Sequence, residues 1–253
     1  MSIAQFLGKD TGPFSSAHRG YSTNAPENTL PALESAFKAG ADIAEIDVRM
    51  TVDGSLVLLH DAEVDRTTDG HGSLSSMTLA EVKKLDAGTW FDREFTGTVI
   101  PTLDEVLDWS RNRLALLIEL KNYPQRDVAF INQFAATILR NNAEHFSIPS
   151  SFDHPTLSEL HRRFPEWTLA MILPCRLSDP VHAARAAGAT LISMEPEFVV
   201  STDVAHLHTA NVSVLTTLKS PEHGNELFEM GLDVFESDDV TFVCETIRRL
   251  SNR

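Results

Sequence analysis

Residues 42–61 read DIAEIDVRMTVDGSLVLLHD, and this stretch decides the fold. It contains two apolar runs of strand length, residues 42–48 and 56–60, on either side of the pair Asp53-Gly54. Only seven residues separate the two runs, whereas a crossover between parallel strands needs about a dozen. Because Asp-Gly is a strong hairpin signal, we predict that the second run folds back on the first as an antiparallel excursion.

The rest of the chain alternates short apolar runs with longer amphipathic segments, which is typical of βα units around a parallel sheet. With residues 56–60 set aside, eight strands remain, and we predict an α/β fold, a (β/α)8 TIM barrel that takes up residues 1–253 as a single domain. The predicted barrel strands are residues 14–18, 42–48, 114–120, 146–152, 168–173, 190–194, 212–217 and 233–237. The predicted helices are residues 29–39, 102–111, 128–141, 156–164, 180–187, 202–209, 223–230 and 240–250.

Residues 61–101 follow the run that ends at His60; they are rich in turn residues and show no strand periodicity. One short helix is predicted there, at residues 78–84. Irregular segments of this length are uncommon in compact domains unless they are functional. We therefore predict a small insertion, or cap subdomain, beside the mouth of the active site.

The overall charge limits the partners. A formal net charge of −15 disfavours nucleic acid and anionic membranes, and an anionic substrate would need a local positive site. No apolar run approaches the roughly 20 residues of a membrane span, and the first residues do not read as a secretory signal. We therefore expect no nucleic-acid partner and no integral membrane segment. Because the chain has only two cysteines, which lie far apart, we expect a reduced, cytoplasmic setting. The oligomeric state stays open.

Three carboxylates fall where predicted strands end. Glu45 and Asp47 are two residues apart, so on a strand both side chains point to the same face, which in a barrel is the interior. Two carboxylates this close repel each other unless a cation lies between them. Glu119 ends the next barrel strand. Three carboxylates on neighbouring strands predict a site for one divalent cation, Mg²⁺ or Ca²⁺.

Histidines and basic residues end the same strands. His18 and His60 are suited to carry protons near neutral pH, one as base and the other as acid. Arg19 and Lys121 could bind phosphate oxygens, or pair with the nearby carboxylates, and the two roles can coexist. Together these residues indicate a metal-assisted reaction on a phosphate.

Taken in order, ten short segments resemble the glycerophosphodiester phosphodiesterase family. The match spans essentially the whole chain and is densest up to about residue 160. The matching segments are His18-Arg19-Gly20, Pro26-Glu27-Asn28-Thr29, Glu45-Ile46-Asp47-Val48, Thr51-Val52-Asp53-Gly54, Leu59-His60-Asp61, Arg66-Thr67-Thr68-Asp69-Gly70, Asp86-Ala87-Gly88, Ile100-Pro101-Thr102-Leu103, Glu119-Leu120-Lys121 and Ser151-Phe152-Asp153.

The resemblance implies a TIM barrel with a small insertion, and an enzyme that hydrolyses glycerophosphodiesters to glycerol 3-phosphate and an alcohol. It implies one divalent cation and acid/base catalysis by two histidines on a small phosphodiester substrate. Carried over by position, it implies Glu45, Asp47 and Glu119 as metal ligands, His18 and His60 as the acid/base pair, and Arg19 and Lys121 as phosphate-binding residues.

The C-terminal third departs from the family pattern. Members commonly show an aromatic-Thr-Val-Asn run at the seventh strand, with the aromatic packed against the non-phosphate part of the substrate. Here Leu215 and Leu218 stand in place of the aromatic and the Asn, and Glu236-Ser237-Asp238 replaces the usual Thr-Asp. Lysophospholipase D activity, or another phosphodiester substrate, is therefore an alternative. The non-enzymatic alternative is a silent barrel that binds phosphate ligands, and the intact set of site residues argues against it.

Overall fold

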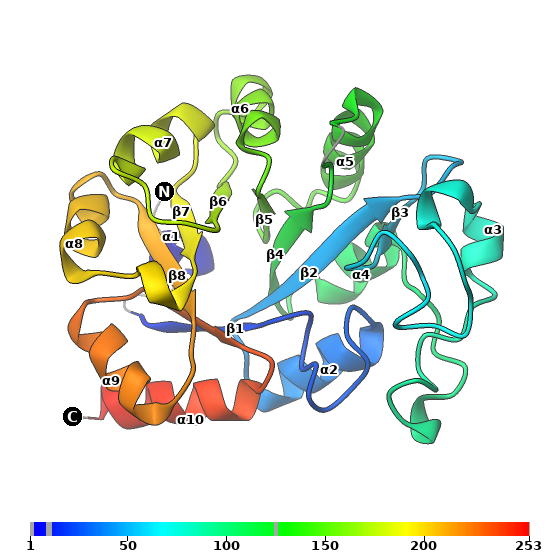
Figure 1. Ribbon diagram of the computed structural model, residues 1–253, viewed down its shortest axis with the longest axis horizontal. Coiled ribbons are helices and arrows are strands. Elements are labelled where there is room, and N and C mark those ends of the chain that lie inside the picture. Colours follow the sequence, from blue (N-terminus) through cyan, green and yellow to red (C-terminus); the bar gives the residue numbers. More distant parts are fainter. Residues whose placement is uncertain (1–2, 9–11, 124–125, 253) are drawn as a thin grey trace.

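The computed structural model describes residues 3–8, 12–123 and 126–252 (Figure 1). The strands are β1 (Phe14–Ala17), β2 (Ile43–Met50), β3 (Leu56–Leu58), β4 (Ala115–Leu120), β5 (Ser147–Ser151), β6 (Ala170–Leu173), β7 (Leu191–Met194), β8 (Ser213–Thr217) and β9 (Val234–Ser237). The helices are α1 (Ile3–Leu7), α2 (Leu30–Ala39), α3 (Leu79–Val82), α4 (Leu103–Ser110), α5 (Val128–Arg140), α6 (His154–Arg163), α7 (Pro180–Ala187), α8 (Ser201–Thr209), α9 (Pro221–Glu229) and α10 (Val240–Ser251), with short 3₁₀ turns η1 (Leu74–Ser76), η2 (Arg93–Phe95) and η3 (Pro196–Phe198).

Within the described residues, eight parallel strands form a closed barrel in the order β1-β9-β8-β7-β6-β5-β4-β2, and β1 pairs with β2 to close it (Figure 1). β3 runs antiparallel to β2, with Met50 opposite Leu56. The predicted (β/α)8 TIM barrel and its hairpin excursion are therefore confirmed. Every predicted strand and barrel helix is present, with its ends within two residues of the prediction. The short helix α1 was not predicted, because five residues are too few to show a helical period.

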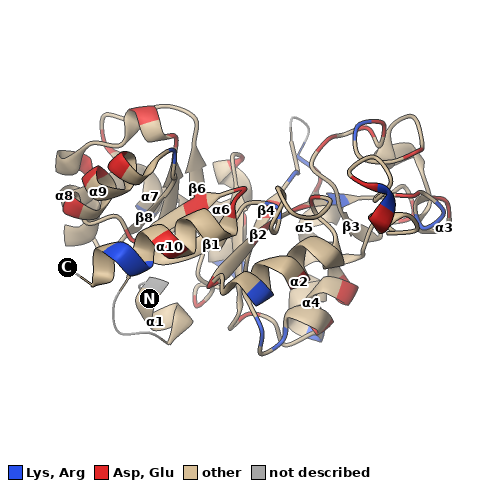
Figure 2. Ribbon diagram, turned by 90° about the horizontal axis from the view of Figure 1, so that it is seen from below, with Lys and Arg blue, Asp and Glu red and all other residues tan. Residues whose placement is uncertain are grey.

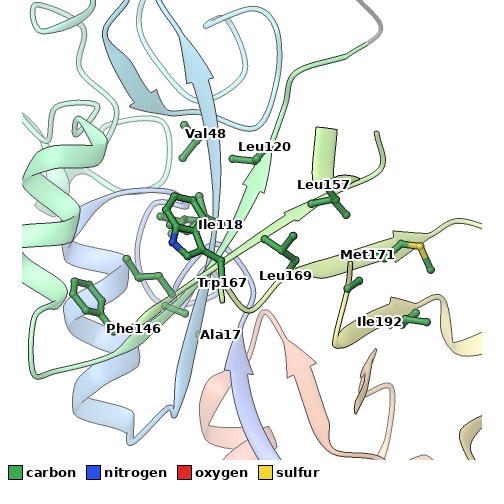
Figure 3. Packing of buried hydrophobic residues seen from close by; sticks show 14 of the residues in the cluster. Ala17, Val48, Ile118, Leu120, Phe146, Leu157, Trp167, Leu169, Met171 and Ile192 are labelled. Carbon is green, nitrogen blue, oxygen red and sulfur yellow. The ribbon is translucent and has the colours of Figure 1, made fainter. Parts of the chain in front are cut away.

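Side chains alternate along each strand between the interior of the barrel and the helices outside it. The outward-facing residues form the larger apolar core, and Figure 3 shows Ile118, Leu169 and Ile192 among the side chains of that cluster. The inward-facing residues form a separate apolar floor at the amino-terminal end of the strands, against which residues of α1 pack. The carboxyl ends of the strands are left for polar side chains, as is usual in this fold.

Helix α2 illustrates how local chemistry places the elements that carry the site. The side chain of Thr29 accepts a hydrogen bond from the backbone N–H of Ala32, and Pro31 occupies the first turn, where no N–H is needed. Gly40 ends the helix with a φ of 89°, a left-handed conformation that favours glycine. The chain is therefore turned directly into β2, which carries two of the predicted metal ligands.

The segment between β3 and α4 contains η1, α3 and η2 and no strand of the main sheet. It has its own apolar cluster, which includes Val64, Leu74 and Val82. Figure 2 shows α3 at the edge of the molecule beside β3, with charged residues of both signs around it. Across the described ranges, no helix is long and apolar enough to cross a membrane.

Candidate active site

The three predicted metal ligands come together at the carboxyl end of β2 and β4. Asp47 of β2 is in register with Glu119 of β4, and Glu45 lies two residues earlier on the same face of β2. One oxygen from each carboxylate lies within 4.8 Å of the others, and all three residues are buried. Three buried carboxylates with oxygen donors fit a hard divalent cation such as Mg²⁺ or Ca²⁺.

The charge of Glu45 is the least compensated of the three carboxylates. Among the residues that the structure describes, no ion pair involves Glu45, although its Oε2 accepts a hydrogen bond from the backbone N–H of Arg19 at 2.9 Å. Burial and the neighbouring charge of Asp47 raise the pKa of Glu45 well above its usual range. A bound cation would remove this cost, so the donor set fits a metal site.

The two predicted phosphate-binding cations lie against the carboxylates. Lys121 Nζ is 3.0 Å from Asp47 Oδ1 and 2.6 Å from Glu119 Oε1, and Arg19 Nε is 3.4 Å from Asp47 Oδ2. Burial alone would raise the pKa of Asp47, but the charges of Lys121 and Arg19 outweigh it and lower that pKa. The salt-bridge role is therefore present in the structure, and both basic side chains also line the site cavity, where they can meet an anion.

Asn28 is a site residue that the sequence did not identify. It has a φ of 56°, which Asn tolerates better than most residues. Its Nδ2 donates to Asp47 Oδ2 at 2.8 Å, while its Oδ1 accepts from the backbone N–H of Asp47 at 2.9 Å. Thr29 caps α2, and Asn28 holds a metal-ligand candidate in place.

Glu27 links the site to the insertion. Its carboxylate accepts hydrogen bonds from Arg19 at 3.0 Å and from both terminal nitrogens of Arg66 at 2.8 Å. Arg66 Nε in turn donates to Asp61 Oδ2 at 2.6 Å. Neither Glu27 nor Arg66 received a role in the sequence analysis, since a separation of 39 positions hides their contact.

Both predicted histidines are held by a carboxylate at Nδ1. His18 Nδ1 lies 2.7 Å from Asp238 Oδ1, and His60 Nδ1 lies 2.6 Å from Asp61 Oδ1. This pairing fixes the ring and leaves Nε2 as the nitrogen for proton exchange. Burial lowers the pKa of His18, but the hydrogen bond to Asp238 and the nearby carboxylates outweigh it and raise the pKa to about 9.

One cavity of about 320 Å³ brings the predicted residues together. The site residues that line it are His18, Arg19, Glu45, His60, Glu119 and Lys121. Asp47, the remaining predicted site residue, is buried and forms an ion pair with Lys121, which does line the cavity.

The two leucines that depart from the family pattern lie away from the cavity. Leu215 belongs to the apolar floor and Leu218 to the outer apolar cluster, and neither lines the cavity. Thr217 does line it, because alternation along β8 turns that side chain inward. The side of the cavity away from the metal ligands is therefore set by other residues than those we compared in the sequence.

Known proteins resemble this chain along nearly its whole length. The model of the glycerophosphoryl diester phosphodiesterase family matches residues 18–241. A glycerophosphodiester phosphodiesterase of Caldanaerobacter subterraneus is 35% identical over 241 residues, which cover 92% of this chain and 97% of that protein.

Solved structures of phosphodiesterases have a similar fold. A phosphodiesterase of Oleispira antarctica, in complex with the product sn-glycerol-3-phosphate, has a TM-score of 0.83 at 29% identity and covers 92% of this chain and 96% of its own. A glycerophosphodiester phosphodiesterase of Agrobacterium tumefaciens has a TM-score of 0.81 at 29% identity, covering 92% and 100%. The chain therefore belongs to the glycerophosphoryl diester phosphodiesterase family and is a phosphodiesterase.

Proposed function

We propose that this enzyme hydrolyses glycerophosphodiesters to glycerol 3-phosphate and an alcohol. The observation that carries the proposal is one cavity lined by two of the three clustered carboxylates, both histidines and both basic residues. The Oleispira antarctica relative, solved with sn-glycerol-3-phosphate as its product, supports the same substrate class.

Glu45, Asp47 and Glu119 would hold one divalent cation, Mg²⁺ or Ca²⁺. When bound, that cation supplies positive charge to the phosphate oxygens, where negative charge accumulates during the reaction. The guanidinium of Arg19 and the ammonium of Lys121 bind further phosphate oxygens and hold the diester in place. Asn28 and Glu27 act through these residues, since they fix Asp47 and Arg19.

His18 and His60 would form the acid/base pair. One ring removes a proton from the attacking hydroxyl, which is either water or the glycerol 2-hydroxyl, and the other protonates the leaving alkoxide. Asp238 and Asp61 hold the two rings in the same way, so we assign the pair rather than either ring to each step.

Residues 61–101 would act as a cap within a single domain of residues 1–253. The support is the pair of hydrogen bonds from Arg66 to Glu27, which ties this segment to the loop between β1 and α2. The absence of a nucleic-acid partner stays a prediction from the charge.

Turnover of glycerophosphocholine and glycerophosphoethanolamine tests the proposal. We expect release of glycerol 3-phosphate that needs Mg²⁺ or Ca²⁺ and stops in EDTA. His18→Ala and His60→Ala should each lower kcat about 10²- to 10⁴-fold. His71→Ala is the matched control, because this 86% exposed ring also pairs with a carboxylate through Nδ1, yet lies outside the cavity lining. No turnover with either cation would contradict the proposal, and lysophospholipids would be tested next.

A further inference from the structure

The interior of the barrel changes character abruptly between two layers. TIM barrels are normally filled by stacked layers of bulky branched side chains. The floor layer follows this rule and consists of Phe14, Ile43, Leu117, Ile148, Ala170, Leu191, Leu215 and Val234. The layer above it, two residues further along each strand, consists of Ser16, Glu45, Glu119, Ser150, Ile172, Ser193, Thr217 and Glu236.

In this second layer only Ile172 is a branched apolar residue. Small hydroxyl side chains do not fill the space that branched residues would, and the cavity of about 320 Å³ lies here. Glu45 and Glu119 are metal-ligand candidates and Ser16 pairs with Glu236, which leaves a polar surface on the β5–β9 side of the cavity. We call this surface the hydroxyl wall and define it as Ser150, Ser193, Thr217 and Glu236.

Ser150 is the strongest sign that the wall binds a ligand. The residue is 1% exposed, it lines the cavity, and its Oγ has no hydrogen-bond partner within the part of the chain that the structure describes. A buried hydroxyl without a partner costs free energy, and a ligand hydroxyl in the cavity would remove that cost.

Glu236 is the second sign. It is 8% exposed, and its Oε2 accepts a hydrogen bond from Ser16 Oγ at 2.8 Å. A carboxylate can accept several hydrogen bonds, and this one lines the cavity beside His18. None of the proposed catalytic steps uses this buried carboxylate.

The chemistry of the wall fits a polyol better than a cation. A quaternary ammonium group would be attracted to Glu236 but could not hydrogen-bond to Ser150 or Ser193. A glycerol moiety offers hydroxyls to these residues, while its C–H faces can contact Ile172 and Phe152 in the same cavity.

We propose that Ser150 and Glu236 bind the free hydroxyls of the glycerol moiety, and that the hydroxyl wall thereby selects diesters whose glycerol is unacylated. This inference rests on the proposed function, since it names the part of that substrate that faces the wall. It favours glycerophosphodiesters over lysophospholipids, in which an acyl chain blocks one of these hydroxyls.

Calorimetric binding of sn-glycerol 3-phosphate and ethyl phosphate, with Ca²⁺ or Mg²⁺ present, tests the inference. The two probes share a phosphate monoester, and only the first carries hydroxyls. We expect wild type to bind sn-glycerol 3-phosphate at least about tenfold more tightly than ethyl phosphate. Ser150→Ala and Glu236→Gln should each cut this preference about fivefold or more, with the affinity for ethyl phosphate kept within about twofold.

Ser147→Ala is the matched control. Ser147 is on the same strand and is also buried, its Oγ has no hydrogen-bond partner among the described residues, and it does not line the cavity, so the preference should not change. Unchanged affinity for ethyl phosphate shows that a variant is folded. If Glu236→Gln binds neither ligand, the result for Ser150→Ala is the test of the inference. A wild-type preference near one, or variants that keep the preference, would overturn the inference. If wild type still turns over glycerophosphocholine in that case, the proposed function survives; if it does not, both fall.

Discussion

Glu45 provides the sharpest test of the metal site, because the stability that its charge costs the metal-free protein can be estimated. Its carboxylate oxygen lies within 4.8 Å of those of Asp47 and Glu119. At an effective dielectric constant of about 20, two charges at that separation repel by about 3 kcal/mol. Lys121, which contacts the other two carboxylates, and the nearby charge of His18 offset part of this repulsion, so we expect a net cost of about 1–3 kcal/mol from Glu45.

The cost should depend on pH. Burial and the charge of Asp47 raise the pKa of Glu45 in the folded protein, so the unfolded chain releases this proton at a lower pH than the folded protein does. In EDTA, the contribution of Glu45 to stability therefore falls as the pH rises above the usual carboxyl range. Glu45→Gln removes this titration and should raise the free energy of unfolding in EDTA by about 1–3 kcal/mol, or several degrees in Tm.

Urea denaturation followed by circular dichroism, in EDTA and in Ca²⁺ or Mg²⁺, measures both effects. At a cation concentration about 100 times Kd, wild type should gain about 2.7 kcal/mol, and Glu45→Gln should lose most of that gain. The control is Glu63→Gln, which makes the same change in net charge at an exposed side chain of the insertion. It should shift stability by less than about 0.5 kcal/mol in either condition.

The reasoning would be refuted if Glu45→Gln were no more stable than wild type in EDTA. It would equally be refuted if the variant kept the full cation-dependent gain. The first result would mean that the protein balances this charge by itself, and the second that the cation binds elsewhere.

Three further changes test other parts of the site. Asp238→Asn should lower the pKa of His18 from about 9, so the limb of the pH–rate profile that reports His18 should move to lower pH; an unmoved profile contradicts the coupling. Asn28→Ala removes the hydrogen bond that holds the Asp47 carboxylate and should weaken cation binding about 10- to 100-fold, as measured by calorimetry. An unchanged affinity would mean that the Asn28 side chain does not position the metal ligand. In Gly88→Ala the new Cβ would lie 1.9 Å from a backbone oxygen, so limited proteolysis should speed up in the insertion while the circular dichroism of the barrel stays native.

The barrel could be predicted because its signals are local. Apolar runs and the Asp53-Gly54 turn each act within a few residues, and together they determine the strand count. The region of the site could also be located, because strand ends place six of the seven predicted residues around one cavity, and the seventh, Asp47, pairs with Lys121. That they act as proposed, and that residues 61–101 form a cap, stays a prediction.

The rest of the site depends on contacts that no local pattern contains. Asn28 bonds to Asp47 from a backbone position with a positive φ, and no local sequence pattern indicates that contact. Asp238 meets His18 across 220 residues, where the barrel closes. Such pairs follow from strand order and register, which become visible only once the sheet is assembled.

Strand register also explains why sequence motifs do not identify the hydroxyl wall. Ser150 and Glu236 belong to different strands, and Ser150 lies outside every segment that matches the family. Each is nevertheless two residues beyond an apolar floor residue of its own strand, as Glu45 is beyond Ile43. Once the floor is known, the same alternation that places the metal ligands places the wall at the same depth. A carboxylate on β9 then lies at the reaction cavity just as one on β2 does, and substitutions there should change which diester is bound without removing the cation site.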